Sequence, residues 1–305
     1  TLVTATYSPR TTLLVVLGFL VVGTLLNAYL VFGAYGHWLP LVTAGGLAFV
    51  SWAIILMFRY LTSEREKRRF RRAVAQYVSP AMARQIAESQ VHLDFSPVNG
   101  HVTCYFSDLA GFTPLSERLG PEGTKTLLNP YLHAMSTVLH RHHAMINKFM
   151  GDGIFAFFNP PILPCPNHEI AGCEAALDSL RSLEDLRAGY ASHALACEFQ
   201  KLFVRIGLSS GPVFVGDYGS ENKLDYTCMG DTVNLASRLE SANKFFGTVI
   251  MLADPVRRAV GERFLYRRLG ALQVKGRSQA MPVHELLGRP GEVAREMLIF
   301  AEVFD

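Results

Sequence analysis

The first 63 residues contain no aspartate or glutamate, although the 305-residue chain has 26 acidic residues in all. The same stretch holds two long apolar runs, at residues 11–35 and 39–60. A helix needs about 20 apolar residues to cross the hydrocarbon core of a bilayer, and both runs reach that length. Two buried core helices are the alternative, but core helices of this length usually carry a polar stripe. The sequence therefore predicts a transmembrane helical hairpin in residues 1–63.

Basic residues gather directly after the second apolar run. Six of the nine residues at 64–72, EREKRRFRR, are Lys or Arg. Basic residues beside a span stay on the cytoplasmic side and are attracted to anionic lipid headgroups. We therefore expect membrane lipid as a partner and residues 64–90 as basic juxtamembrane and linker helices. Nucleic acid is the other reading of such a run, and its position beside a span argues against it.

The chain also lacks a disulfide or zinc framework built on cysteine. Its 5 cysteines are Cys104, Cys165, Cys173, Cys197 and Cys228, and no two have the Cys-x-x-Cys spacing. All of them follow the apolar region, and their number is odd. This usage is typical of a reduced cytosolic domain with no disulfide framework and no zinc site.

Beyond residue 90, short apolar segments alternate with helical periodicity. The predicted strands are 101–106, 144–149, 154–158, 203–210, 213–216, 225–229, 249–252, 264–269 and 283–287. The predicted helices are 121–143, 168–186 and 230–243. Asp-Gly marks a hairpin turn between the second and third strands, and Gly211-Pro212 predicts a turn between two others. The pattern predicts an α+β domain at 91–289 with a mostly antiparallel sheet, then a helical extension at 290–305 that continues beyond the sequence.

Two aspartates are predicted where strands end. Residues 106–113 read FSDLAGFT, so a turn of small residues follows Asp108, and its main-chain amides are expected to face a ligand. Residues 147–153 read NKFMGDG, which places Asp152 at the hairpin tip. Two such carboxylates can hold a pair of hard divalent cations that also bind phosphates. The alternative for Asp108 is a turn residue that caps the next helix, and a Gly-Asp-Gly hairpin taken alone is more often only a turn.

A third segment carries an amide and a guanidinium on one helix face. Residues 225–238 read DYTCMGDTVNLASR, and Asn234 and Arg238 are four apart. The rigid fork of arginine suits phosphate charge, whereas a surface salt bridge is the alternative for Arg238 alone.

Four histidines crowd one predicted helix. They are His133, His140, His142 and His143. The spacing of His140 and His143 suits a metal, but no partner carboxylate is evident, so a solvated or packed face is expected.

Together the three segments resemble the class III adenylyl and guanylyl cyclase catalytic domain, over residues 98–287. The resemblance implies a ferredoxin-like core with flanking helices. It also implies two Mg²⁺ or Mn²⁺ ions bound by Asp108, Asp152 and the carbonyl of Leu109. The other implied contacts are substrate phosphates at Gly111, Phe112 and Thr113, the purine at Lys148 and Thr227, the ribose at Asn234, the transition state at Arg238 and terminal phosphates at Lys275.

The purine-reading pair sets the expected substrate. In this family adenylyl cyclases have Lys and then Asp or Thr, whereas guanylyl cyclases typically have Glu and Cys. Lys148 would donate to N1 of adenine and Thr227 would accept from its amine, so ATP is expected as substrate. Pro212 stands where some members carry an arginine.

The family also implies a site shared by two catalytic domains, and hence a homodimer that is inactive as a lone domain. The apolar hairpin and basic helix resemble bacterial receptor cyclases, so a multi-pass protein of the bacterial cytoplasmic membrane with a cytosolic catalytic domain and a sensor input is expected. A non-catalytic pseudo-cyclase signalling subunit and a cyclase that uses GTP are the alternatives. A diguanylate cyclase would need a second acid in the turn at 150–153, MGDG.

Overall fold

The computed structural model describes residues 96–220, 225–273 and 280–292, together with eight helical residues in the N-terminal region. The chain divides into two compact units, Thr1–Arg72 and Ala73–Asp305. Within the described residues, no helix combines the length and apolarity that a membrane span requires. The expected spans lie almost wholly outside the described residues, as do the expected linker helices and most of the expected C-terminal extension.

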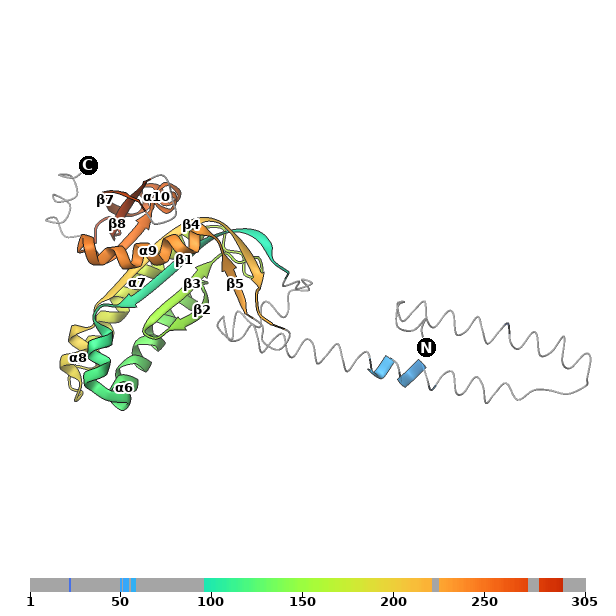
Figure 1. Cartoon of the computed structure of the whole chain (residues 1–305), viewed down its shortest axis with the longest axis horizontal. Helices are drawn as coiled ribbons and strands as arrows, with labels where there is room; N and C mark the ends of the chain where they lie inside the picture. The colour runs from blue at the N-terminus through green and yellow to red at the C-terminus, as the bar shows by residue number, and fades with distance from the viewer. Residues whose placement is uncertain are drawn as a thin grey trace, which may run out of the picture. The chain divides into compact units, whose positions relative to one another are not determined.

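The second unit is built on one eight-stranded sheet with helices packed against it (Figure 1). The strands are β1 (Val98–Leu109), β2 (Met145–Met150), β3 (Gly153–Phe158), β4 (Val204–Asp217), β5 (Tyr226–Met229), β6 (Ile250–Ala253), β7 (Leu265–Leu272) and β8 (Met281–Gly288). Their order is β2-β3-β1-β4-β6-β8-β7, with β5 paired to β4 off this path. Of the described strand pairs, only β4 and β6 run parallel. The expectation of a mostly antiparallel sheet is confirmed.

The helices cover both faces of the sheet. They are α6 (Phe112–Arg141), α7 (His168–Gly189), α8 (Ala196–Lys201), α9 (Asp231–Phe246) and α10 (Asp254–Val260), with the 3₁₀ turn η2 (Gly261–Arg263). Ile206 and Leu208 of β4 belong to the main core, which also contains residues of α6 and α7. Because side chains alternate along a strand, Gly207 faces the opposite side, where α9 lies.

Glycines let α9 approach β4 closely. A Cβ atom at Gly207 would lie 2.2 Å from the carbonyl oxygen of Ala236 and 2.3 Å from the backbone nitrogen of Glu240. A Cβ atom at Gly211 would lie 2.7 Å from Oγ1 of Thr232. Both glycines are therefore needed for the seating of α9, the helix that carries Asn234 and Arg238.

The prediction of a turn at Gly211-Pro212 is wrong, because strand β4 continues without interruption through both residues. Pro212 lies opposite His101 of β1, and its carbonyl accepts a hydrogen bond from Oγ1 of Thr232 at 3.1 Å. The carbonyl and nitrogen of a strand residue point to the same side, so the nitrogen of Pro212 also points away from β1. The missing N–H is thus not needed for the β1–β4 ladder.

The helix expected at 121–143 is only the second part of α6, which begins at Phe112. Gly120, with φ 66° and ψ −179°, interrupts the helical geometry, and Pro121 follows it. The helix start has no side-chain cap and follows Gly111 at φ 71°, so a capping pattern was absent from the sequence. The short helices α8 and α10 were also missed, since neither is long enough to show periodicity.

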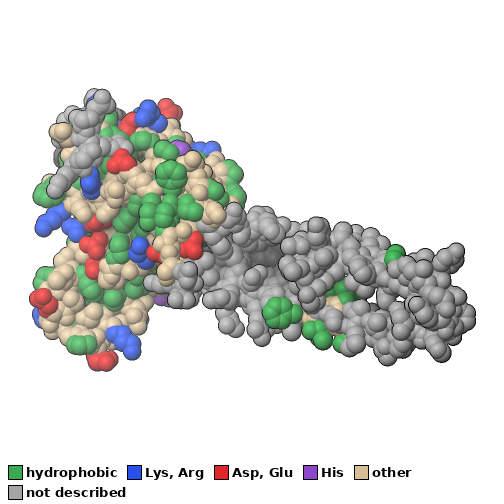
Figure 2. All heavy atoms as spheres, turned by 45° about the vertical axis from the view of Figure 1, so that its right-hand side comes forward, with side chains coloured by type: hydrophobic (Ala, Val, Ile, Leu, Met, Phe, Trp, Pro, Cys, Tyr) green, Lys and Arg blue, Asp and Glu red, His purple; other side chains and the backbone are tan. Residues whose placement is uncertain are grey.

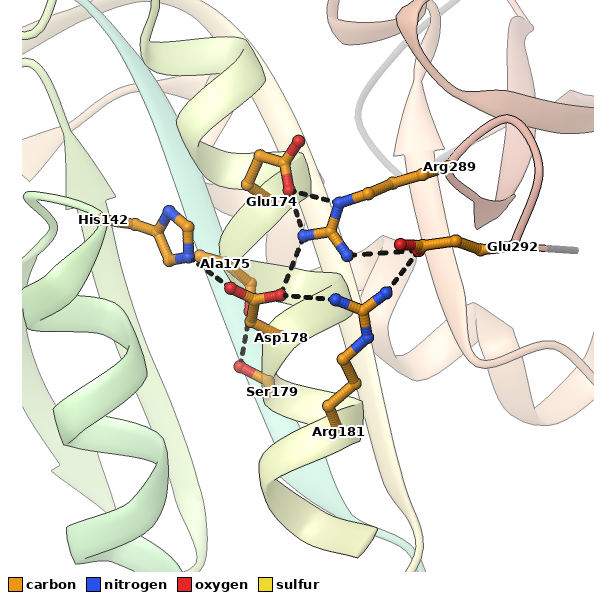
Figure 3. Close-up of polar contacts among 8 residues, drawn as sticks. All are labelled: His142, Glu174, Ala175, Asp178, Ser179, Arg181, Arg289 and Glu292. Carbon is orange, nitrogen blue, oxygen red and sulfur yellow. Dashed lines mark hydrogen bonds and ion pairs between the residues drawn. The ribbon is translucent and has the colours of Figure 1, made fainter. Parts of the chain in front are cut away.

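A network of charged side chains joins the end of β8 to α7 and α6 (Figure 3). Nε of Arg289 lies 2.7 Å from Glu174, and its Nη2 lies 2.8 Å from Asp178, both on α7. Asp178 also lies 2.8 Å from Nε2 of His142, at the end of α6. His142 therefore has a carboxylate partner, on another helix, that the sequence did not make evident, and of the two expected surroundings, solvated or packed, this residue has the packed one.

Candidate active site

Asp108 and Asp152 come together where β1 ends beside the β2–β3 hairpin. The antiparallel pairing of β1 with β3 brings the hairpin tip to this end of β1. The backbone N–H of Leu109 donates to Oδ2 of Asp152 at 3.1 Å. A Cβ atom on the next residue, Gly153, would lie 3.5 Å from Oδ1 of Asp108. Two residues 44 positions apart (152 − 108) thus form one carboxylate pair.

The pair is electrostatically unfavourable without a cation. Burial, the charge of Asp108 and a hydrogen bond with it raise the pKa of Asp152 to about 6, against the opposing effect of the amides of Asp152 and Leu109. A bound cation would relieve the repulsion that raises this pKa. The donors are carboxylate and carbonyl oxygens, which hard cations such as Mg²⁺ and Mn²⁺ prefer. The residues present therefore fit divalent ions of that class.

Arg205 and Glu240 extend the site, and sequence reasoning missed both. Arg205 lies opposite Asp108 in the β1–β4 register, and its Nη2 is 3.5 Å from Oδ2 of that aspartate. Its Nε lies 3.3 Å from Oε1 of Glu240 on α9, and burial raises the pKa of Glu240. Arg205 thus connects the carboxylate pair to α9. A lone arginine in the apolar run VRIGL at 204–208 was the signal available in the sequence.

The amides after Asp108 divide into two sets. Those of Leu109 and Ala110 were expected to face a ligand, but the first donates to Asp152 and the second to the carbonyl of Phe203 at 2.7 Å. Gly111, Phe112 and Thr113 stand at the start of α6, where the first N–H groups of any helix lack an intrahelical acceptor. Asp108 does not cap this helix, because α6 has no side-chain cap.

Lys148 and Thr227 lie on two strands, β2 and β5, that a side-chain hydrogen bond links. Nδ2 of Asn147, on β2, donates to the carbonyl of Tyr226, on β5, at 2.9 Å. Lys148 and Thr227 are the residues that follow these two partners. Lys148 is exposed and adjoins a register shift in the β2–β3 pairing, whereas Thr227 is only 5% exposed.

Asn234 and Arg238 lie on α9, which matches the helix expected at 230–243. Asn234 is exposed and Arg238 is partly buried. The structure brings this helix to the carboxylate pair through Arg205 and Glu240. Lys275, expected to bind terminal phosphates, lies outside the described residues.

Comparison with known proteins identifies the family of this domain. The sequence profile described as "Adenylate and Guanylate cyclase catalytic domain" matches residues 96–288. The chain belongs to this cyclase family.

Two named relatives of the cyclase domain are bacterial adenylate cyclases. Adenylate cyclase 1 of Rhizobium meliloti (strain 1021) is 35% identical over 214 residues, which is 70% of this chain and 31% of that protein. Adenylate cyclase of Anabaena cylindrica is 30% identical over 188 residues, 61% of this chain and 36% of that protein. The chain thus matches only about a third of the length of each relative.

Solved cyclase structures share the fold. The adenylyl cyclase CyaB from P. aeruginosa is 28% identical, with a TM-score of 0.58 over 66% of this chain and 100% of that one. The guanylyl cyclase Cya2 is also 28% identical, with a TM-score of 0.57 over 65% of this chain and 98% of that one. An adenylyl cyclase and a guanylyl cyclase are thus equally similar to this chain. The comparison of structures does not decide between ATP and GTP, so that choice has to be argued from Lys148 and Thr227.

Proposed function

We propose that this cyclase domain converts ATP into 3′,5′-cyclic AMP and pyrophosphate. The observation that carries the proposal is the carboxylate pair of Asp108 and Asp152, joined through the amide of Leu109. The two named adenylate cyclase relatives support the same activity.

Asp108, Asp152 and the carbonyl of Leu109 would hold two divalent cations, which would activate the attacking oxygen and neutralise phosphate charge. In the reaction the ribose 3′ oxygen forms a bond to the α-phosphorus, the bond from that phosphorus to the bridging oxygen breaks, and the hydroxyl proton leaves to solvent. The chain's part is to position groups and stabilise charge, as in other phosphoryl transfers.

In this proposal three residues and a helix start position the ribose and the phosphates of the nucleotide. Amides of Gly111, Phe112 and Thr113 would bind phosphate oxygens at the positive end of α6. Asn234 would orient the ribose, and Arg238 would donate to the charge that develops on the α-phosphate. Lys275 would hold the terminal phosphates.

Base choice is assigned to Lys148 and Thr227. A lysine donates to the N1 acceptor of adenine, and a threonine hydroxyl accepts from the adenine amine. Guanine has an N–H donor at N1, which would leave the Lys148 donor without an acceptor, whereas the Thr227 hydroxyl would have to turn and donate to the guanine oxygen. The Asn147–Tyr226 hydrogen bond supports this pairing because it holds the two strands together.

A homodimer is proposed because the face around these residues is apolar and exposed. Phe149 and Met150 follow Lys148 and are 49% and 46% exposed. Phe214 and Met229 pair across β4 and β5 and are 53% and 48% exposed. Apolar side chains gather on the face of the domain seen in Figure 2. Patches of this kind mark association surfaces, and a second copy would cover this one.

In that homodimer each site is composite. One protomer supplies the carboxylate pair of Asp108 and Asp152. The other protomer supplies Lys148, Thr227, Asn234 and Arg238. Two equivalent sites result, and an isolated domain would be inactive.

We further propose that residues 1–63 form the membrane hairpin and that residues 64–90 link it to the catalytic domain at 91–289. Two apolar runs without acidic residues, followed by a basic segment, support this assignment. The protein would then be a multi-pass protein of the bacterial cytoplasmic membrane that couples a sensor input to a cytosolic cyclase, with residues 290–305 as a helical extension.

The test is turnover by the purified full chain in detergent. ATP or GTP is supplied with Mg²⁺, with Mn²⁺ or with EDTA, and the cyclic product is measured. We expect cyclic AMP from ATP only with a metal, and a lower rate with GTP. Faster turnover of GTP would make the protein a guanylate cyclase. No cyclic product from a folded dimer would favour a non-catalytic signalling subunit.

A further inference from the structure

A second cluster of metal-ligating side chains lies away from the carboxylate pair. His101 of β1 and two residues at the start of α7, His168 and Glu169, offer ligand atoms that all lie within 4.8 Å of one another. Two imidazoles and one carboxylate are a recurrent ligand set for zinc sites that keep one position open.

Two of the three side chains are held in place by neighbours. His168 is 6% exposed, and its Nδ1 lies 2.8 Å from Oγ1 of Thr103. Ser210 donates from Oγ to Oε1 of Glu169 at 2.8 Å. Such outer contacts orient ligands in metal sites and raise their affinity. Burial also lowers the pKa of His168, and this effect is larger than the opposing effect of the Glu169 charge. The lowered pKa favours the neutral imidazole, which is the form that binds a metal.

The third side chain has the freedom to complete the set. His101 is exposed, and its ring centroid lies 5.4 Å from that of His168. With zinc–nitrogen distances of about 2.0 Å, ligand atoms in a tetrahedral site are roughly 3.3 Å apart. Rotation of the exposed His101 side chain would close the remaining gap.

We propose that His101, His168 and Glu169 bind a divalent transition metal such as Zn²⁺, with water as the fourth ligand. Imidazole ligands favour Zn²⁺ over Mg²⁺ or Mn²⁺, so this site and the carboxylate pair select different ions. His101 lies seven residues before Asp108 on β1, a separation of about 23 Å. The metal would therefore fasten the start of β1 to the start of α7 without entering the cyclase reaction.

This site departs from the expectation drawn from cysteine spacing, because its ligands are not cysteines. His101 and His168 are 67 residues apart (168 − 101), so no short pattern in the sequence joins them. A polar network that only packs α7 against the sheet is the alternative.

The experiment uses the full chain with Asp108→Asn and Asp152→Asn, so that the catalytic carboxylates do not contribute. Zn²⁺ affinity is measured by competition with a chromophoric chelator, and Co²⁺ binding by its visible absorption. His101→Ala and Glu169→Gln are introduced into this background. His101 is exposed, and glutamine retains an oxygen that accepts from Ser210, so both variants are expected to fold. His133→Ala, at another exposed histidine, is the matched control.

We expect one zinc ion to remain bound in the background protein. Both His101→Ala and Glu169→Gln should weaken its affinity at least tenfold and remove the Co²⁺ absorption, since each deletes a ligand or its charge. His133→Ala should change neither. Loss of zinc binding in the background protein, or equal affinity in all four proteins, would overturn the proposal. Neither result bears on the turnover test of the cyclase activity.

Discussion

At the residue scale, Asp152 shows how the proposed metal-binding site opposes folding. Its pKa in the folded protein, about 6, lies above the ordinary value of 3.8. Above pH 6 the carboxylate is ionised in both the folded and the unfolded state, and the full destabilisation is present. As pH falls from 6 to 4 the folded state takes up the proton first, so the destabilisation is relieved.

Asp152→Asn should therefore stabilise the metal-free protein at pH 8. A shift of about two pKa units corresponds to ~3 kcal/mol at most, and screening at a half-exposed group reduces this to about 1 kcal/mol. Asparagine keeps an oxygen that accepts from Leu109. Thermal unfolding in EDTA at pH 8 and pH 4 is the measurement. The gain should vanish at pH 4, and an equal or lower unfolding temperature for the variant at pH 8 would contradict this account.

In the proposed function, the choice between ATP and GTP depends on the side chains of Lys148 and Thr227. Lys148→Glu combined with Thr227→Cys should reverse the hydrogen-bonding pattern presented to the purine. Thr227 is buried, and the second chain of the proposed homodimer would cover Lys148. Each mismatched polar contact there costs about 1–3 kcal/mol, so the ATP:GTP ratio of kcat/KM should fall by roughly 100-fold. The ratio is measured because total activity will also fall. An unchanged ratio in a folded dimer would remove these two residues from base recognition.

Site residues were predictable from the sequence to the extent that each lies in a short local motif. Asp108, Asp152 and Asn234 belong to such motifs, and the structure places them at a strand end, a hairpin tip and a helix face. Arg205 and Glu240 were not predicted from the sequence, because their contact joins a strand to a helix and the two residues are 35 positions apart (240 − 205). Long-range ion pairs leave no periodic pattern.

At the element scale, the seating of α9 on β4 determines where Asn234 and Arg238 lie. Gly207→Ala would place a Cβ atom against the backbone of Ala236 and Glu240. We expect this overpacking to lower the free energy of unfolding by about 1–3 kcal/mol. We also expect kcat to fall, because α9 would shift. Urea unfolding and turnover assays measure the two effects.

Gly189→Ala is the matched control for this variant, because nothing lies within 4 Å of a Cβ atom there. Its stability should change by less than about 0.5 kcal/mol. Similar behaviour of the two variants would mean that α9 does not depend on the close approach at Gly207.

The elements themselves show which local signals a fold overrides. Gly-Pro usually marks a turn, yet Pro212 continues β4 because its backbone nitrogen points away from the β1 ladder. The hairpin around residues 151–153 was predicted correctly, although its two-residue loop is Gly151-Asp152, with Gly151 at φ 67°, and not the Asp152-Gly153 pair that signalled it. The first part of α6 was missed because its start depends on Gly111 and not on a capping side chain.

At the scale of the whole molecule, the proposed active site requires two chains. The exposed apolar residues Phe149, Met150, Phe214 and Met229 adjoin the proposed purine-reading strands. The carboxylate pair lies at the end of β1 and the tip of the β2–β3 hairpin, and in the proposed homodimer it meets Lys148, Thr227, Asn234 and Arg238 of the second chain. Mutations on the two sides of the composite site should therefore complement each other.

Mixing Asp152→Ala chains with Arg238→Ala chains tests whether the two protomers share each site. Each variant alone should be inactive, because both of its sites lack one essential group. In a heterodimer one site carries both changes and the other carries neither. With random exchange half of the dimers are mixed and each has one intact site, so cyclic AMP formation should recover to about a quarter of the wild-type rate. No recovery in a mixture shown to contain heterodimers would contradict the shared site.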